Sequence, residues 1–438
     1  MTMTADEMST YWMPFTANRS FGKAPRLFTA ADGMFYSTDS GHRVLDSIAG
    51  LWCVNAGHGR RPIIDAIKES AERLDFASSF QVSHPAAFEL SQMIVARSPM
   101  PDGNVFLSNS GSEAVDTALK IARGYFAMKG EAGRKRLIGR TRGYHGMGWG
   151  GLSVGGIGRH RRDFEPLIGQ VDHIRHPYDP AVSRFSRGQP EKGVDYADDL
   201  TDLLTLHDPA TVAAVIVEPV AGSAGVFPPP VGYLEKLRAV CDQHGILLIF
   251  DEVITGFGRI GARFAANRFG VQPDIITCAK GLSNGAVPIG ATIVSKAVHD
   301  AYMENSCEEI ELAHGYTYSG HPLACAAAIA TIRLFDEEGL WTRVTGLEGA
   351  FESAMHGLKE QKLVTDVRNI GLLAGIDLAP VAGQRGARAK RIADLCFDRG
   401  VLVRSSGDTL IISPPLIIEV DQIDLIATTI AGALDDCT

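Results

Sequence analysis

Short, continuous runs of apolar residues, separated by helical patterns, constrain the fold of this chain more than any other feature. The runs occupy residues 105–107, 212–217, 246–250, 275–276 and 293–294. Strands that are buried on both faces of a parallel sheet have this Val/Ile/Leu-rich composition. Between the second and third runs, residues 232–244 place Leu234, Leu237 and Val240 at helical spacing. The alternation predicts an α/β fold with a mostly parallel central sheet flanked by helices.

The two ends of the chain lack this pattern. Residues 34–46 predict an antiparallel hairpin, and residues 401–403 and 410–412 predict two late strands joined by a turn at Gly407-Asp408. A chain of 438 residues also exceeds the roughly 250–300 residues at which one hydrophobic core stops growing. We therefore expect a large domain over residues 61–325. A small α+β domain is expected from the N-terminal segment 1–60 together with residues 326–438.

Charge and cysteine usage exclude several classes of function. The net charge is −9, which disfavours nucleic acid or an anionic membrane surface as a partner. The longest apolar run, residues 323–330, is too short for a membrane span of about 20 residues. Seven cysteines without a Cys-x-x-Cys pair indicate reduced thiols, a cytoplasmic location and no structural zinc site. His173 and His176 lack a third ligand, and we interpret them as surface residues rather than a metal site.

Charged residues follow three of the predicted central strands. Glu218, Asp251 and Lys280 each stand at or just after the end of an apolar run. Ligands of open parallel sheets bind outside the carboxyl ends of the strands. One such residue is most simply a polar strand cap, whereas three at equivalent positions favour a shared site. The basic run at residues 159–162 has no such context, and we interpret it as a solvated loop.

Small residues fill the turn between the first strand and the next helical pattern. This turn contains Ser110, Gly111 and Ser112, with Ser112 as the expected helix N-cap. Backbone N–H groups at such a turn, together with the helix dipole, can bind an anion such as phosphate. The turn is equally compatible with a simple capped helix.

A phosphate cradle, an acid and a lysine together suit one cofactor. Lysine forms Schiff bases with carbonyl compounds. A carboxylate beside a pyridine nitrogen keeps that ring protonated, which makes it an electron sink. These are the requirements of pyridoxal 5'-phosphate, although the residues alone leave this assignment open.

The whole chain resembles the class III, fold-type I aminotransferases that depend on pyridoxal 5'-phosphate. The nearest branch is that of the ω-amino acid:pyruvate, or β-alanine–pyruvate, enzymes. The resemblance rests on an ordered set of stretches rather than on any single one. They are Tyr11-Trp-Met-Pro-Phe-Thr-Ala-Asn18, Gly50-Leu-Trp-Cys53, Asn109-Ser-Gly-Ser-Glu113, Gly143-Tyr-His-Gly146, Val217-Glu-Pro-Val220, Phe250-Asp-Glu-Val-Ile-Thr-Gly-Phe-Gly-Arg259, Ala279-Lys-Gly281 and His314-Gly-Tyr-Thr-Tyr-Ser-Gly-His-Pro322.

The resemblance implies roles for residues around the cofactor. Lys280 would bind the cofactor covalently and then shuttle a proton, and Asp251 would pair with the ring nitrogen. Val253 and Tyr144 would enclose the ring, and Ser110, Gly111 and Ser112 would hold the phosphate. Glu218 and His145 would lie near the ring. Thr317 would reach the phosphate from a partner subunit, which implies a homodimer and leaves a tetramer open.

Substrate residues also follow from the resemblance. Trp52, Phe80 and Tyr144 would wall the amine pocket, and Arg404 would bind the carboxylate of the keto acid. Relatives that use 2-oxoglutarate carry a further arginine shortly after the Gly-Asp turn. Here that stretch, residues 410–413, has no cation, so pyruvate is the expected acceptor.

The expected reaction converts an amine or ω-amino acid to an aldehyde or ketone and converts pyruvate to L-alanine. An aminomutase or a decarboxylating aminotransferase of the same fold is the alternative, because fold does not fix function. A non-catalytic protein that binds pyridoxal phosphate is a further alternative.

Overall fold

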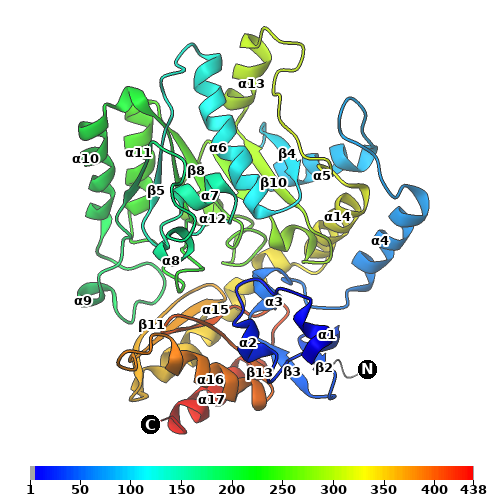
Figure 1. Cartoon of the computed structure of the whole chain (residues 1–438), viewed down its shortest axis with the longest axis vertical. Helices are drawn as coiled ribbons and strands as arrows, with labels where there is room; N and C mark the ends of the chain where they lie inside the picture. The colour runs from blue at the N-terminus through cyan, green and yellow to red at the C-terminus, as the bar shows by residue number, and fades with distance from the viewer. Residues whose placement is uncertain (1–4, 438) are drawn as a thin grey trace.

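A computed structural model describes residues 5–437 of the chain as three sheets surrounded by helices. In Figure 1 the largest sheet lies in the upper part of the view, and the two smaller sheets lie below it. The N-terminal and C-terminal parts of the chain lie together in the lower part, although hundreds of residues separate them in sequence. No helix in the described part of the chain is long and apolar enough to cross a membrane.

The large sheet has seven strands, in the order β4-β10-β9-β8-β7-β5-β6. Strands β9, β8, β7, β5 and β6 run parallel, while β10 is antiparallel to both of its neighbours. The strands are β4 (Asn104–Ser108), β5 (Arg136–Arg140), β6 (Val171–Ile174), β7 (Val212–Val217), β8 (Leu247–Asp251), β9 (Ile275–Cys278) and β10 (Gly290–Val294). Every residue of β7 to β10 is buried, which confirms the expected apolar, mostly parallel centre.

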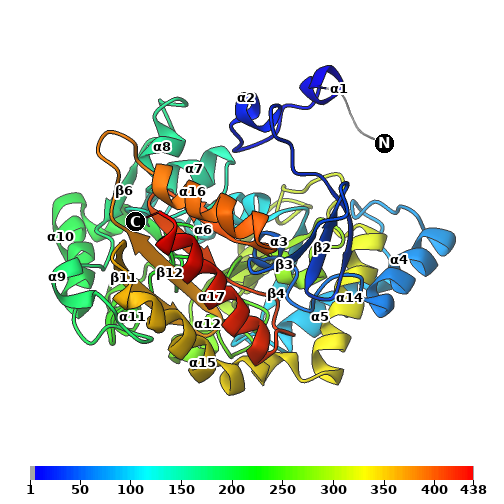
Figure 2. The same cartoon turned by 90° about the horizontal axis from the view of Figure 1, so that it is seen from below.

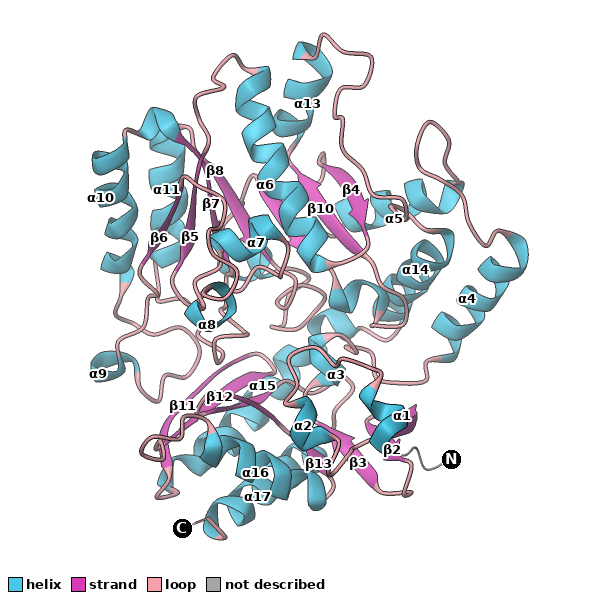
Figure 3. Ribbon diagram, viewed as in Figure 1, coloured by secondary structure: helices cyan, strands magenta, loops and turns pink. Residues whose placement is uncertain are grey.

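Helices cover this sheet and shield its apolar faces, as Figure 3 shows. The long helix α6 contacts β4 and β7 to β10, and α11 contacts β8. The helices between residues 49 and 337 are α3 (Ala49–Trp52), α4 (Arg61–Arg73), α5 (Pro85–Val95), α6 (Gly111–Met128), α7 (Trp149–Val154), α8 (Gly158–Arg161), α9 (Pro180–Ser183), α10 (Asp198–His207), α11 (Tyr233–His244), α12 (Ala265–Phe269), α13 (Lys296–Asn305) and α14 (Pro322–Glu337); of these, α3 lies beside the small sheets (Figure 1). Helix α11 ends at Gly245, whose left-handed backbone (φ +60°) terminates it, so the helix predicted over 232–244 is confirmed.

Both chain ends build the two small sheets. One has the order β1-β2-β3-β13 and the other β11-β12-β15-β14. The strands are β1 (Phe28–Asp32), β2 (Phe35–Thr38), β3 (Arg43–Asp46), β11 (Val364–Ile370), β12 (Leu373–Leu378), β13 (Val401–Leu402), β14 (Arg404–Ser406) and β15 (Thr409–Ile412). Strands β2 and β3 form the N-terminal hairpin predicted from the sequence.

The sequence predicted that residues 401–403 pair with residues 410–412 in a hairpin, and this pairing is wrong. Across the turn, β15 pairs with β14, the strand that begins at Arg404. Strand β13 instead runs parallel to β3 in the other sheet. The sequence could not distinguish these pairings. An apolar run such as residues 401–403 would be buried whichever of the two small sheets its strand joined.

Helices α15 (Leu340–His356), α16 (Ala387–Asp398) and α17 (Val420–Asp435) pack around these small sheets, and α1 (Ala5–Ser9) and α2 (Asn18–Phe21) lie at the periphery (Figure 2). We propose the division into a large domain and a small domain from both ends as a description of this architecture. The proposed boundary at residue 325 falls inside α14, which packs against α4 and α5 of the large domain.

Candidate active site

Three parallel strands bring Glu218, Asp251 and Lys280 to one edge of the large sheet. Asp251 ends β8, Glu218 directly follows β7, and Lys280 lies two residues after the end of β9. All three line one pocket. The rule that ligands bind at the carboxyl ends of parallel strands therefore predicted their convergence correctly.

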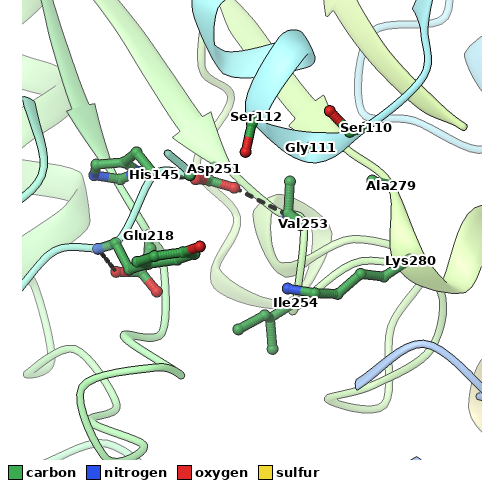
Figure 4. A pocket seen from close by; sticks show the side chains of 12 residues that line it. Ser110, Gly111, Ser112, His145, Glu218, Asp251, Val253, Ile254, Ala279 and Lys280 are labelled. Carbon is green, nitrogen blue, oxygen red and sulfur yellow. Dashed lines mark hydrogen bonds and ion pairs between the residues drawn. The ribbon is translucent and has the colours of Figure 1, made fainter. Parts of the chain in front are cut away.

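The turn between β4 and α6 forms a second wall of this pocket. Ser110, Gly111 and Ser112 line it (Figure 4), at the N-terminus of a helix of 18 residues. The N-cap is Ser110 rather than the predicted Ser112: the Glu113 backbone N–H donates to Ser110 Oγ (3.2 Å). Ser112 Oγ instead accepts the Met147 N–H (3.2 Å), which ties the turn to the Tyr144–Met147 loop.

Two glycines allow the close approach of these backbone segments. A Cβ at Gly111 would lie 3.0 Å from both Cγ atoms of Val253. Gly146 has φ +92°, and a Cβ there would lie 2.4 Å from Ser112 Oγ. Glycine is therefore required at position 146, and a larger residue at position 111 would be tightly packed against Val253.

Two hydrogen bonds fix the carboxylate of Asp251. Its Oδ2 lies 2.8 Å from His145 Nδ1, and its Oδ1 accepts the Val253 N–H (3.1 Å). Asp251 is 5% exposed and His145 1% exposed, so the pair is held away from water. His145 Nε2 is buried without a hydrogen-bond partner among the described residues.

Glu218 is buried beside this pair. Its Oε1 accepts the Tyr144 N–H (3.0 Å), and its Oε2 accepts the Gly222 N–H (3.2 Å). Burial raises the pKa of Glu218, while the positive charge of Arg140 opposes that rise. Arg140 also donates to the Glu218 carbonyl oxygen (2.8 Å), so this arginine positions the strand end that carries Glu218.

Lys280 combines a strained backbone with a buried amine. Its φ of +47° lies in the left-handed region, which is unfavourable for a residue with a side chain and is common at functional sites. Its Nζ lies 5.4 Å from the centroid of the Trp52 ring. Burial lowers the pKa of Lys280, which favours the neutral, nucleophilic amine. Figure 4 shows Lys280, Asp251 and Ser112 reaching the same pocket from different elements.

Arg404 approaches the pocket from the small sheets. Its guanidinium carbon lies 5.1 Å from the Trp52 ring centroid, so Trp52 lies between the small sheets and Lys280. The Arg404 Nε is buried without a hydrogen-bond partner in the described chain. Burial lowers the pKa of Arg404, and the nearby Tyr144 opposes that effect.

Four of the predicted site residues do not line this pocket: Trp52 and Arg404, which lie beside it, and Phe80 and Thr317. Phe80 is 55% exposed and lines a separate groove with His314 and Gly315. Thr317 is exposed. The pocket of this chain thus brings together Ser110, Gly111, Ser112, Tyr144, His145, Glu218, Asp251, Val253 and Lys280.

Some residues of the site were not predicted. Gly146, Ile254 and Ala279 also line the pocket, each next to a residue named from the sequence. Arg140 ends β5, so its position at a strand end was a usable signal. The apolar run 137–138 that precedes it is too short to identify a strand from the sequence.

The donor set fits pyridoxal 5'-phosphate. The helix N-terminus and serine hydroxyls suit a phosphate dianion, and the fixed Asp251 carboxylate suits a protonated ring nitrogen. The Lys280 amine suits an aldehyde carbon. The described residues contain no group of three or more His, Cys, Asp or Glu side chains arranged to hold a metal ion.

Comparisons with known proteins agree with this chemistry. The model of the class-III aminotransferase family matches residues 16–434. An ω-aminotransferase from Caulobacter vibrioides is 52% identical over 98% of this chain and 98% of its own length. A β-alanine–pyruvate aminotransferase from Pseudomonas aeruginosa is 44% identical over 97% of this chain and 95% of its own length. The crystal structure of an amine transaminase from an uncultivated Pseudomonas species, with pyridoxal phosphate bound, superposes with a TM-score of 0.91 at 34% identity and covers 98% of this chain and 99% of that one.

Proposed function

The chain belongs to the class-III aminotransferases, which depend on pyridoxal 5'-phosphate, and from this premise we propose that it is an ω-transaminase. It transfers an amino group from an amine or an ω-amino acid, such as β-alanine, to pyruvate. The products are an aldehyde or ketone and L-alanine. The name of the Pseudomonas relative supports β-alanine and pyruvate as substrates, and the name of the Caulobacter relative supports transfer of an ω-amino group.

The observation that carries the proposal is that Lys280 and Asp251 line the same pocket. Lys280 binds the cofactor and later moves a proton at the substrate carbon, for which its lowered pKa suits it. Asp251 holds a proton on the ring nitrogen. When bound, the protonated ring supplies an electron sink for the substrate carbanion.

The remaining pocket residues orient the cofactor. The N–H groups and hydroxyls at Ser110, Gly111 and Ser112 bind the phosphate, and Val253 and Tyr144 enclose the ring. His145 fixes Asp251 through their 2.8 Å hydrogen bond. Glu218 accepts the backbone N–H of Tyr144 and so holds that residue in place beside the cofactor.

Arg404 and Trp52 are the proposed substrate residues of this chain. The Arg404 guanidinium binds the pyruvate carboxylate, because its planar fork matches a carboxylate. The stretch 410–413, where relatives that use 2-oxoglutarate carry a second arginine, is buried and has no cation here. Trp52 and Tyr144 wall the amine side of the pocket.

We propose a homodimer as the active unit. Thr317 and Phe80 are exposed and lie outside the pocket of their own chain, so both are available to a second copy. In the dimer, Thr317 reaches the phosphate of the partner and Phe80 joins the amine wall. Static light scattering tests the dimer, and a monomeric, fully active protein would refute it.

A cytoplasmic location stays a prediction from the sequence. The seven cysteines form no disulfide in the described chain, which is typical of a reducing compartment.

The test of the function is a spectral titration of the purified holoenzyme. β-Alanine or an aryl-alkyl amine should bleach the visible band of the bound cofactor, and pyruvate should restore it. The restored band separates a transaminase from an aminomutase, which needs no external acceptor. Released CO₂ would indicate a decarboxylating enzyme, and a band that no amine alters would indicate a non-catalytic protein.

Two variants connect the titration to the site. Lys280→Ala should abolish turnover, because it removes both the covalent anchor and the proton carrier. Lys296→Ala is the matched control, since Lys296 is an exposed lysine that pairs with Asp300. Full turnover by Lys280→Ala would refute the proposed role.

A further inference from the structure

A second chamber lies next to the catalytic pocket: His160 lines the chamber, Tyr144 lines the pocket, and their ring centroids are 5.6 Å apart. It is lined by residues 12–17, by Arg159 and His160 of α8, and by residues 404–407. Three segments that are distant in sequence therefore meet here. We call this space the outer chamber. Asn18 holds the 12–17 segment in place: its side chain accepts the Met13 N–H (3.0 Å) and donates to the Met13 and Thr16 carbonyls (3.0 and 2.9 Å).

A row of aromatic rings connects the outer chamber to the catalytic pocket. The Phe15 ring lies 5.1 Å from the His160 ring, and the His160 ring lies 5.6 Å from the Tyr144 ring, both edge to face. Burial and the neighbouring Arg159 lower the pKa of His160, so this imidazole is neutral near pH 7. The row is thus an uncharged wall that suits methylene groups.

The charge of the outer chamber is entirely positive. Arg159 and Arg404 line it, and none of the described lining residues is acidic. Arg159 forms no ion pair with the side chains of residues 7–437, and it is exposed. Its neighbours differ: Arg161 donates to the Ser153 and Gly155 carbonyls (3.0 and 2.6 Å), and Arg162 pairs with Asp163 (3.4 Å). The expectation of a solvated basic loop at 159–162 is wrong in part: residues 158–161 form helix α8 and Arg161 is half-buried, whereas Arg159 is exposed and lines the chamber.

We propose that Arg159 is a specificity-determining residue that binds, with Arg404, the carboxylate of ω-amino acids longer than β-alanine. The methylene chain lies along the Phe15–His160–Tyr144 row, and the amino group reaches Lys280. Binding of such a donor requires an uncharged wall for its methylene groups and a cation for its carboxylate. The Phe15–His160–Tyr144 row provides the wall, and Arg159 and Arg404 provide the cations. This inference rests on the proposed transaminase function, since it places the donor in the same active site.

The experiment compares donors of equal length with and without the carboxylate. KM for 6-aminohexanoic acid, β-alanine and hexylamine is measured for the wild type, Arg159→Ala, Arg159→Lys and Arg162→Ala. Arg162→Ala is the matched control, because Arg162 belongs to the same basic run but does not line the chamber. Binding of hexanoate, which has no amino group, is measured in parallel by calorimetry on the holoenzyme.

We expect Arg159→Ala to raise KM for 6-aminohexanoic acid by about fivefold, the upper range for one solvent-accessible ion pair. KM for hexylamine and β-alanine should change much less, and Arg159→Lys should restore part of the loss. Hexanoate should bind the wild type more tightly than Arg159→Ala, and added salt should weaken that difference, because salt screens exposed charges.

Equal changes for 6-aminohexanoic acid and hexylamine would overturn the proposal, as would equal effects of Arg159→Ala and Arg162→Ala. If no amine is a substrate of the wild type, the proposed function fails. The calorimetric comparison then still decides whether Arg159 binds a carboxylate.

Discussion

Replacement of Arg368 by methionine should destabilise the protein more than any surface substitution. Arg368 lies on β11, is 0% exposed and makes five hydrogen bonds. Two go to the carbonyls of Gly225 and Val226 (2.6 and 2.8 Å). Three go to the carboxylates of Asp366 (2.7 Å) and Asp377 (2.8 and 2.9 Å). Methionine keeps much of the volume but leaves the buried Asp366 carboxylate without its cation.

The magnitude follows from this burial. Removing one partner of a buried ion pair costs about 3–5 kcal/mol. The Asp366 carboxylate keeps the hydrogen bonds from the Tyr178 hydroxyl (2.7 Å) and the Phe185 N–H (2.6 Å), but it loses the cation that neutralises it. Unfolding entropy is about 2.1 cal/mol/K per residue, so 4 kcal/mol lowers the melting temperature by about 4 °C if all 438 residues unfold together. The shift is about 11 °C if the proposed small domain unfolds alone.

Differential scanning calorimetry of the holoenzyme measures this shift. Arg187→Met is the control, because Arg187 forms one exposed ion pair with Glu352 (2.9 Å) and should shift the melting temperature by less than about 1 °C. A melting temperature of Arg368→Met within 1 °C of the wild type would refute the reasoning. A large shift also matters for the site, since Gly225 and Val226 belong to the same loop as Gly222, which donates to Glu218.

Three further predictions concern the site and its surroundings. Arg404→Ala should raise KM for pyruvate by about tenfold or more, the value of a charge-assisted hydrogen bond, and KM for an uncharged amine much less; equal effects would remove Arg404 from carboxylate binding. Gly111→Ala should weaken binding of pyridoxal phosphate about tenfold, because overpacking against Val253 costs about 1–3 kcal/mol, whereas Gly349→Ala, whose Cβ meets nothing within 4 Å, should leave it unchanged. Burial raises the pKa of Glu252 to about 7. The folded state therefore binds this proton more tightly than the unfolded chain does. The free energy of unfolding should fall as the pH rises from about 4.5 to about 7. Glu252→Gln should flatten that fall in melting temperature between pH 5 and pH 8, and identical slopes in both proteins would contradict it.

The sequence identified the central strands because their signal is local. Residues 212–217 and 246–250 are continuous apolar runs, and the structure places both in the centre of the sheet. The charged residues at their ends could be assigned to one site, since parallel strands share a carboxyl edge. The antiparallel direction of β10 was not visible, because a strand buried on both faces has the same composition in either direction.

The burial of isolated polar residues could not be predicted from the sequence. His176 was expected at the surface, yet it is 8% exposed and packs edge to face on Phe227 at 4.7 Å. Neither ring nitrogen of His176 has a hydrogen-bond partner in the described chain. Nothing in the neighbouring sequence marks this environment, because Phe227 lies 51 positions away and Arg368 also packs on its ring (3.9 Å).

By itself, the sequence determined the α/β class, the strand ends that carry Glu218, Asp251 and Lys280, and the position of the serine-rich turn that lines the pocket. Each of these features depends on a few consecutive residues, either through their hydrophobic periodicity or through a charged residue at the end of a strand. The tertiary structure alone decided that β13 joins the N-terminal sheet while Arg404, two residues later, enters another. It also decided that Arg159 and Arg404 line one chamber. Such contacts join segments hundreds of residues apart, and they depend on the packing of the whole chain rather than on local preference.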